Sequence, residues 1–143
     1  MAMFVRYIEE ARLTIFRAKH EADRFGSLEI APEHILLALL SDPILINRTL
    51  KGVSEKEMRE TIDAYLPRRK PNTLPHDLPL SEAARRALVL AEEEADRLGH
   101  AKIRNEHLLL GLVKSGDSYA AELLVIKGLS ADKLGRQLES PPS

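Results

Sequence analysis

The chain contains an internal duplication, which limits its possible folds more than any other feature. The segment EHILLALL at 33–40 returns as EHLLLGLV at 106–113. The match extends upstream at the same offset and, after a slip of three residues, continues downstream, where KGVS at 51–54 returns as KGLS at 127–130. The upstream residues that recur are Glu9, Ala11, Arg12, Ala18, Glu21, Ala22, Asp23, Arg24, Gly26 and Ile30, which return as Glu82, Ala84, Arg85, Ala91, Glu94, Ala95, Asp96, Arg97, Gly99 and Ile103. Two copies of one unit predict two halves of similar structure.

Composition excludes several classes of protein. The 143 residues suit one compact domain, and 44% hydrophobic with 30% charged residues is typical of an ordinary globular chain. A net charge of −1 removes the electrostatic drive of nucleic-acid binders, and the basic run at 68–70 is too short to restore it. There is no cysteine and no long apolar run, so we expect a cytoplasmic protein without disulfides, cofactors or a membrane span. A monomer is expected, because two repeats in one chain can bury each other's apolar helices.

Apolar spacing in the first copy predicts four helices over residues 4–66. A stripe over 4–25 ends at Gly26, and Pro32 opens a helix that is apolar almost all round and is therefore expected to be buried. A short helix at 44–51 ends at Gly52, and Ser54 begins a capping box that opens the fourth helix. The prolines between 67 and 79 predict an exposed linker.

The second copy repeats this pattern over residues 80–139. Ser81 is predicted to cap a long helix that ends before Gly99, and Asn105 to cap the second buried helix. Two short helices separated by Gly128 complete the set. With no sustained strand alternation, we predict a single all-helical domain over residues 1–143.

The two Glu-His pairs are the first candidates for chemistry. Glu33 and Glu106 lie in first turns, which the helix dipole favours, and His34 and His107 are interpreted as packed between helices. The two carboxylates could alternatively form matched pockets for a guanidinium group. An acid-base or metal enzyme built on the four residues is a further alternative, but no ligand spacing or nucleophile accompanies them.

Other polar and apolar features are given structural interpretations. The acidic run at 92–94 is expected on an exposed helix face. His20, His76 and His100 fit no shared metal spacing, so no metal site is predicted. Met3 and Phe4 are expected to pack into the core, with Phe4 as a possible protein-docking residue.

The second motif resembles a known family. The segment LGH at 98–100, followed by NEHLLLGL at 105–112 and AAELL at 120–124, resembles the Clp N-terminal repeat domain at the front of the ClpA, ClpB and ClpC unfoldases, and the ClpC type most. This resemblance implies a pseudo-twofold bundle of eight helices in two tandem four-helix repeats, which agrees with the helix count above. It also implies a non-enzymatic module that receives substrate or adaptor proteins for an ATPase ring and its partner peptidase.

The resemblance further implies that Glu33 and Glu106 contribute to pockets for phosphorylated arginine. The family commonly has Gly-Thr before each Glu-His, whereas this chain has Ala31-Pro32 and Arg104-Asn105. Pro32 lacks a backbone N–H, so we expect any phosphoarginine site to be weak or confined to the second repeat. There Arg104 supplies charge for the phosphate or pairs with Glu106 itself.

Two non-enzymatic functions follow. In the first, the chain is a recognition module that docks substrates or adaptors of a Clp protease system. In the second, it is a free-standing regulator that binds Clp components, such as the ATPase ring, without an ATPase of its own. No ATPase motif lies within the chain, so these residues alone are not expected to unfold or cleave a protein.

Overall fold

The computed structural model describes residues 4–73 and 77–139. In these residues there are eight helices and no strand, which confirms the all-α prediction. The helices are α1 Glu9–Arg24, α2 Pro32–Leu39, α3 Pro43–Thr49, α4 Glu55–Tyr65, α5 Glu82–Arg97, α6 Asn105–Ser115, α7 Tyr119–Ile126 and α8 Ala131–Glu139.

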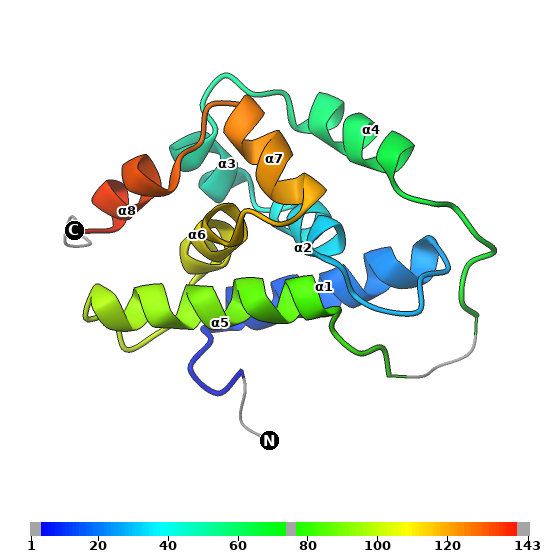
Figure 1. Cartoon of the computed structure of the whole chain (residues 1–143), viewed down its shortest axis with the longest axis horizontal. Coiled ribbons are helices and arrows are strands. Elements are labelled where there is room, and N and C mark those ends of the chain that lie inside the picture. The colour runs from blue at the N-terminus through cyan, green and yellow to red at the C-terminus, as the bar shows by residue number, and fades with distance from the viewer. Residues whose placement is uncertain (1–3, 74–76, 140–143) are drawn as a thin grey trace.

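The helices form three levels (Figure 1). The long helices α1 and α5 lie on one side, the short helices α3, α4, α7 and α8 lie on the other, and α2 and α6 lie between them. Every residue of α2 is buried, and so are eight of the eleven residues of α6. The prediction that the motif helices are the buried ones is therefore confirmed, and each is covered by helices from both repeats.

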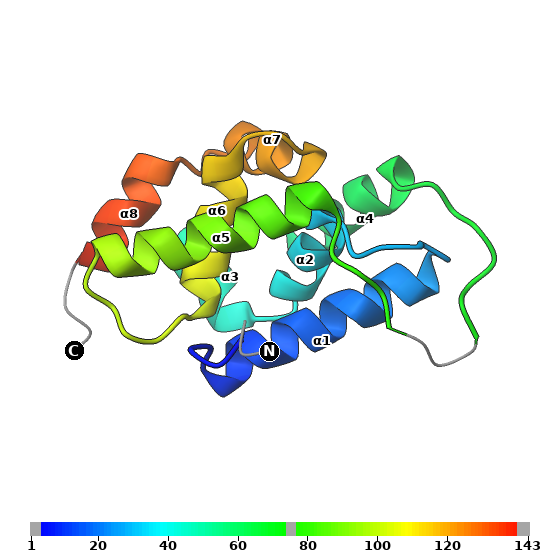
Figure 2. The same cartoon turned by 60° about the horizontal axis from the view of Figure 1, so that its bottom comes forward.

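The two repeats exchange short backbone contacts (Figure 2). The segment before α1 pairs with the loop before α6, and the segment before α5 pairs in the same way with the loop before α2. The N–H groups of Ile8 and Ser81 donate to the carbonyls of Ile103 and Ile30 at 3.0 and 2.9 Å, and Ile103 and Ile30 donate back to Arg6 and Pro79 at 2.9 and 2.8 Å. These four bonds occupy equivalent positions in the two copies, so each half is anchored by the other.

Residues 68–72 lie against the turn after α1, although most of them are exposed. The backbone N–H groups of Arg69 and Asn72 donate to Phe25 and Asp23, at 3.0 and 2.9 Å. Gly26 has φ +68°, and a Cβ there would lie 2.2 Å from the Lys70 carbonyl oxygen. A glycine is therefore required at this turn by both its backbone conformation and the close approach of the chain.

The helix starts agree with the sequence in three places and differ in two. Pro32 is the first residue of α2, and the hydroxyls of Ser54 and Ser81 accept from N–H groups in α4 and α5. The first helix begins at Glu9 rather than at residue 4. The prediction that Asn105 caps α6 was wrong, because Arg104 occupies the N-cap position.

The side chain of Asn105 instead joins three helices. Its Oδ1 accepts from the Thr14 hydroxyl at 2.8 Å, and its Nδ2 donates to Asp42 Oδ2 at 2.9 Å. Thr14 lies on α1, and Asp42 caps α3 by accepting from the N–H of Leu45. Asn105 is buried, so these partners satisfy an amide that would otherwise be costly inside the fold.

Helices α5 and α6 approach each other closely at Gly111. A Cβ at Gly111 would lie 2.2 Å from the Ala87 carbonyl oxygen and 2.9 Å from the Ala91 side chain. Neither backbone can yield without separating the two helices, so the packing of α5 on α6 depends on the missing side chain.

We predict that Gly111→Ala destabilises the fold by about 1–3 kcal/mol despite the higher helix propensity of alanine, because the added methyl overpacks a rigid contact. Urea unfolding measures the change. The matched control is Gly135→Ala in α8, where the new Cβ would meet only Arg97 Nη2 at 3.7 Å. The control should be neutral or stabilised by up to about 1 kcal/mol, and equal effects at both positions would contradict the prediction.

Candidate functional site

Glu33 is in the first turn of α2, where the sequence places it, and its carboxylate is used inside the fold. The side chain is 7% exposed, and its Oε2 accepts from the backbone N–H of Ala120 at 3.0 Å. Ala120 is in the first turn of α7, whose N–H groups and dipole favour a negative charge. Glu33 therefore fixes the start of a helix from the other repeat.

Glu106 occupies the equivalent position in α6 but has different surroundings. Its Oε2 lies 3.6 Å from Nη1 of Arg48, and the Arg48 side chain is 69% exposed. An ion pair of this kind contributes at most about 1 kcal/mol. Arg104 lies two residues earlier and is exposed. A ligand could therefore replace the present partner of the Glu106 carboxylate more easily than it could replace that of Glu33.

His34 and His107 are buried between helices, as predicted. Their Nδ1 atoms accept from the backbone N–H groups of Ala31 and Arg104, each at 2.9 Å. Burial lowers the pKa of both imidazoles to about 4, and for His107 the neighbouring His100 and Arg104 lower the pKa further. Both rings are therefore neutral at pH 7 and serve to close the first turns of α2 and α6.

Sequence reasoning missed the contact between His100 and His107. Nδ1 of His100 lies 2.9 Å from Nε2 of His107, and the rings meet edge to face. Because Nδ1 of His107 accepts from a backbone N–H, its Nε2 carries the proton and donates to His100. The loop between α5 and α6 brings the two rings together, and helical periodicity carries no information about such a loop.

A groove of about 510 Å³ lies beside Glu33, between the α1–α2 turn and the end of α4. Its walls combine apolar and aromatic side chains with two carboxylates and the guanidinium group of Arg69. Tyr65, which is 53% exposed, stacks on Tyr119 of α7 with ring centroids 3.8 Å apart. The lining residues are Phe25, Ser27, Leu28, Glu29, Ala31, Glu33, His34, Tyr65, Leu66, Pro67 and Arg69.

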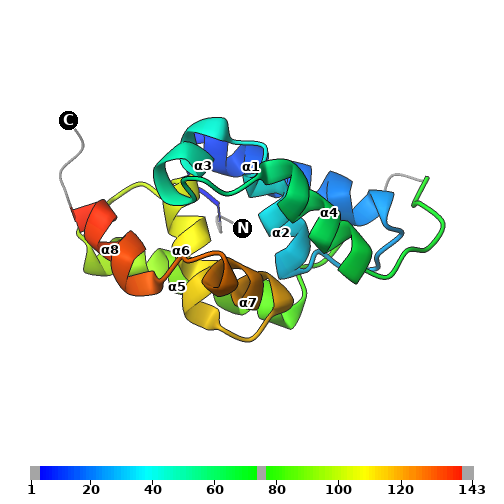
Figure 3. The same ribbon diagram turned by 90° about the horizontal axis from the view of Figure 1, so that it is seen from above.

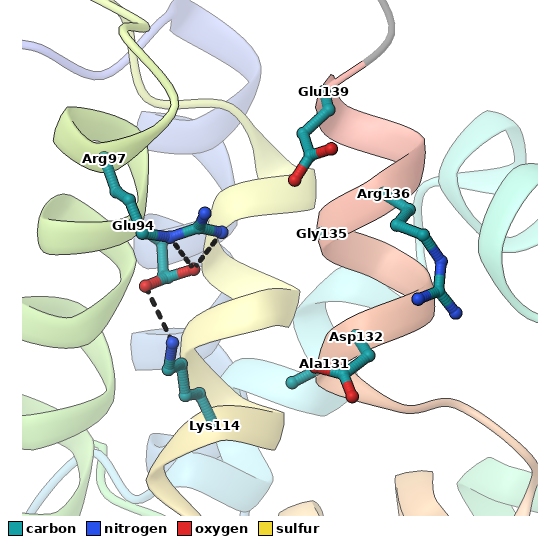
Figure 4. A pocket seen from close by; sticks show the side chains of 8 residues that line it. All are labelled: Glu94, Arg97, Lys114, Ala131, Asp132, Gly135, Arg136 and Glu139. Atoms are coloured by element: carbon teal, nitrogen blue, oxygen red, sulfur yellow. Dashed lines mark hydrogen bonds and ion pairs between the residues drawn. The ribbon is translucent and has the colours of Figure 1, made fainter.

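A second cavity, of about 400 Å³, lies between α5, α6 and α8 (Figure 4). The acidic run at 92–94 was expected to be exposed, but this was wrong for Glu94, which is 6% exposed. Arg97 and Lys114 both donate to its carboxylate at 2.9 Å, and the hydrogen bond from Arg97 is the main cause of its lowered pKa. Figure 4 shows this carboxylate facing both cations, so the cavity wall is already charge-balanced.

The other sequence candidates do not converge on the groove. Phe4 is half-buried and meets Tyr7 edge to face, with ring centroids 5.0 Å apart. Met3 and His76 lie outside the described residues. Within those residues no group of His, Cys, Asp and Glu side chains could hold a metal ion, and none of the described helices has the length and apolar character to span a bilayer.

The two neutral histidines should make stability depend on pH. An unfolded histidine has a pKa of about 6.5, so between about pH 4 and 6.5 the unfolded chain binds more protons than the folded one. The free energy of unfolding should therefore rise with pH through this window and level off above it. His107→Asn keeps an acceptor for the Arg104 N–H and removes the titration.

Urea unfolding at pH 5 and pH 7.5 tests this prediction. The free energy of unfolding of the wild type should be higher at pH 7.5 than at pH 5. In His107→Asn this difference should be smaller, by up to about 1.4 kcal/mol per pH unit. His20→Asn is the control, because His20 is exposed on α1. An unchanged pH dependence in His107→Asn would show that this ring does not titrate as described.

Comparison with known proteins identifies the repeat unit. Residues 6–127 match the family described as the Clp repeat (R) N-terminal domain. The chain is 37% identical to chloroplastic ClpC of Pisum sativum over 92% of its own length and 14% of the relative, so it spans about one seventh of that protein.

Solved structures share the fold. The N-terminal domain of ClpD from Arabidopsis thaliana superposes with a TM-score of 0.73 at 23% identity, covering 94% of this chain and 93% of that one. A ClpV N-domain in complex with a VipB peptide superposes with a TM-score of 0.76 at 19% identity, covering 97% and 88%. The family match over most of the chain, with the two buried Glu-His helices, shows that this protein belongs to the Clp repeat N-terminal domain family.

Proposed function

We propose that this chain is a non-enzymatic recognition module that binds substrate or adaptor proteins of an ATP-dependent Clp system. The observation that carries the proposal is the groove beside Glu33, which combines apolar walls and exposed aromatic surface with charged side chains. A related N-domain has been solved with a bound peptide, which supports a peptide as the ligand class. A reducing compartment such as the cytosol suits a chain without cysteine.

The motif residues support binding rather than catalysis. The Glu33 carboxylate caps α7, and the Nδ1 atoms of His34 and His107 cap their own helices. A general base needs a group that is free to take a proton near pH 7, whereas burial holds both imidazole pKa values at about 4. The groove is suited to an extended segment with apolar side chains and one basic side chain, for which the exposed Glu29 supplies negative charge.

We predict that Leu28→Ala with Tyr65→Ala weakens binding of a short peptide that carries one arginine between apolar residues. Leu28 is 71% exposed at the groove, and each truncation removes roughly 1–2 kcal/mol of apolar contact, so Kd should rise about tenfold or more. Fluorescence anisotropy measures Kd.

Val89→Ala is the matched control, because Val89 is exposed on α5, away from the groove. Equal affinities for the wild type, the double variant and the control would rule out the groove as the binding site.

Adding the chain to a separately purified Clp ring distinguishes a recognition module from a free-standing regulator. A change in ATP hydrolysis or proteolysis without peptide delivery would favour the free-standing regulator.

A narrower proposal concerns phosphorylated arginine. The open carboxylate of Glu106 is suited to a guanidinium, which must displace only the exposed Arg48, and Arg104 is near enough in sequence to supply charge for the phosphate. At the first repeat the Glu33 carboxylate already bonds Ala120, and Pro32 has no N–H to offer a phosphate. We therefore place any phosphoarginine site in the second repeat.

Calorimetry with free phosphoarginine is expected to show one weak site that is lost in Glu106→Gln and retained in Glu33→Gln. The glutamine at 33 keeps an acceptor for the Ala120 N–H, so the fold should survive. Arg104→Ala should weaken phosphoarginine more than arginine. Two equal sites that are lost together in Glu33→Ala and Glu106→Ala would overturn the proposal.

A further inference from the structure

A basic pocket lies where the ends of α3 and α7 meet the start of α8. It has a volume of about 220 Å³, and four of its lining side chains are cations, Arg48, Lys51, Lys127 and Lys133. Among residues 4–73 and 77–139, no acidic side chain lines the pocket, and its remaining lining residues are Thr49, Leu50, Gly128, Leu129 and Gln137. The whole chain has a net charge of −1, so this concentration of positive charge is local.

The pseudo-symmetry of the fold creates part of this concentration. Lys51 and Lys127 are equivalent residues of the two KG turns, which follow α3 and α7. Figure 3 shows the α3–α4 and α7–α8 connections on the same side of the molecule, and both lysines line the same pocket. Two copies of one turn thus bring two like charges to one place.

Helix dipoles favour three of the four cations, namely Arg48 in the last turn of α3 and the two lysines that follow α3 and α7, but not Lys133. A cation near the end of α3 or α7 is favoured by the negative end of the helix dipole. Lys133 is in the first turn of α8, where its N–H donates to the Ser130 hydroxyl and where the dipole disfavours a cation. The equivalent residue of the first repeat is Glu57, which suits a first turn. Lys133 therefore adds positive charge where local helix stability favours an acid.

Within the described residues, the ion pairs compensate this charge only in part. Arg48 has Glu106 at 3.6 Å, while no ion pair within the described ranges involves Lys51, Lys127 or Lys133. Like charges around one small cavity repel, and an anion bound among them would relieve that repulsion.

We propose that this pocket binds an oxyanion carried on a partner polypeptide, either a phosphoryl group or a carboxylate. The volume is suited to one such group and its stem, and lysine ammonium groups bind either oxyanion as point charges. The proposal rests on the proposed function in that the partner is a protein, but it uses a surface separate from the groove beside Glu33. A nucleic acid is the competing ligand.

Fluorescence anisotropy with a labelled acidic peptide tests the proposal. One peptide carries a single phosphoserine, a second has glutamate there, and a third has serine. The wild type should bind the first or second more tightly than the third, with an affinity that falls as salt rises. Whichever of these two peptides binds more tightly identifies the oxyanion. Inorganic phosphate should displace the bound peptide only weakly, because the rest of the polypeptide also contributes to binding.

Lys133→Glu is the decisive variant, because it introduces the residue that the first repeat has at this position and should not weaken α8. It should raise Kd about tenfold or more by reversing one charge at the pocket, while the thermal midpoint stays the same or rises. Lys102→Glu is the control, since Lys102 is exposed in the loop between α5 and α6. The groove variant Leu28→Ala with Tyr65→Ala should bind the acidic peptide normally.

This last variant separates the two proposals. If the groove variant loses binding of the arginine peptide but still binds the acidic peptide, both proposed sites are supported. If the wild type does not bind the acidic peptide, while the groove variant still loses the arginine peptide, only the basic pocket is overturned. Equal weakening by Lys133→Glu and Lys102→Glu would also overturn it. So would a single-stranded oligonucleotide that binds more tightly than every peptide and depends on the same lysines.

Discussion

The burial of two helices that are apolar on nearly every side determines the rest of this structure. Neither α2 nor α6 can be covered by the helices of its own repeat alone, so the remaining helices surround them jointly. The exchanged backbone bonds at Ile30 and Ile103 serve this arrangement, because they hold the entry to each buried helix against the opposite repeat. A half of the chain would leave one such helix partly in water, which is why the duplication forms one domain.

Equivalent positions have acquired different tasks on this symmetric frame. Glu33 caps α7, a helix of the other repeat. In the second repeat it is Asn105, the residue before Glu106, that bonds Asp42 at the start of α3, and Glu106 forms an ion pair with the exposed Arg48. A proline removes one N–H at the start of α2, and Arg104 adds a charge at the start of α6. One repeat thus uses its motif carboxylate for stability, and the other keeps it accessible.

The sequence predicted what periodicity and local chemistry determine. Helix order, the glycine stops, the buried motif helices and the caps at Ser54 and Ser81 follow from residues close together in the chain. The contact of His100 with His107 was missed because it depends on the path of a loop, and two other features were missed because they depend on a partner far away in sequence. Asn105 bonds Thr14 and Asp42, and the buried carboxylate of Glu94 accepts a hydrogen bond from Lys114. The role of neither side chain could be predicted from the sequence of its own helix. The groove and the basic pocket likewise arise between elements, where a sequence pattern gives no distances.

The short helix α7 links both proposed binding regions. Its first residue, Tyr119, stacks on Tyr65 at the groove, its next N–H is held by Glu33, and Lys127 after its last turn lines the basic pocket. Eight helical residues span about 12 Å, a distance that an extended polypeptide covers with about four residues. The N–H of Ala120 in the first turn of this helix is held by the Glu33 carboxylate of the other repeat. One buried hydrogen bond between the repeats therefore fixes the start of a helix that borders both proposed regions, so Glu33 contributes to the shape of this surface as well as to the stability of the fold.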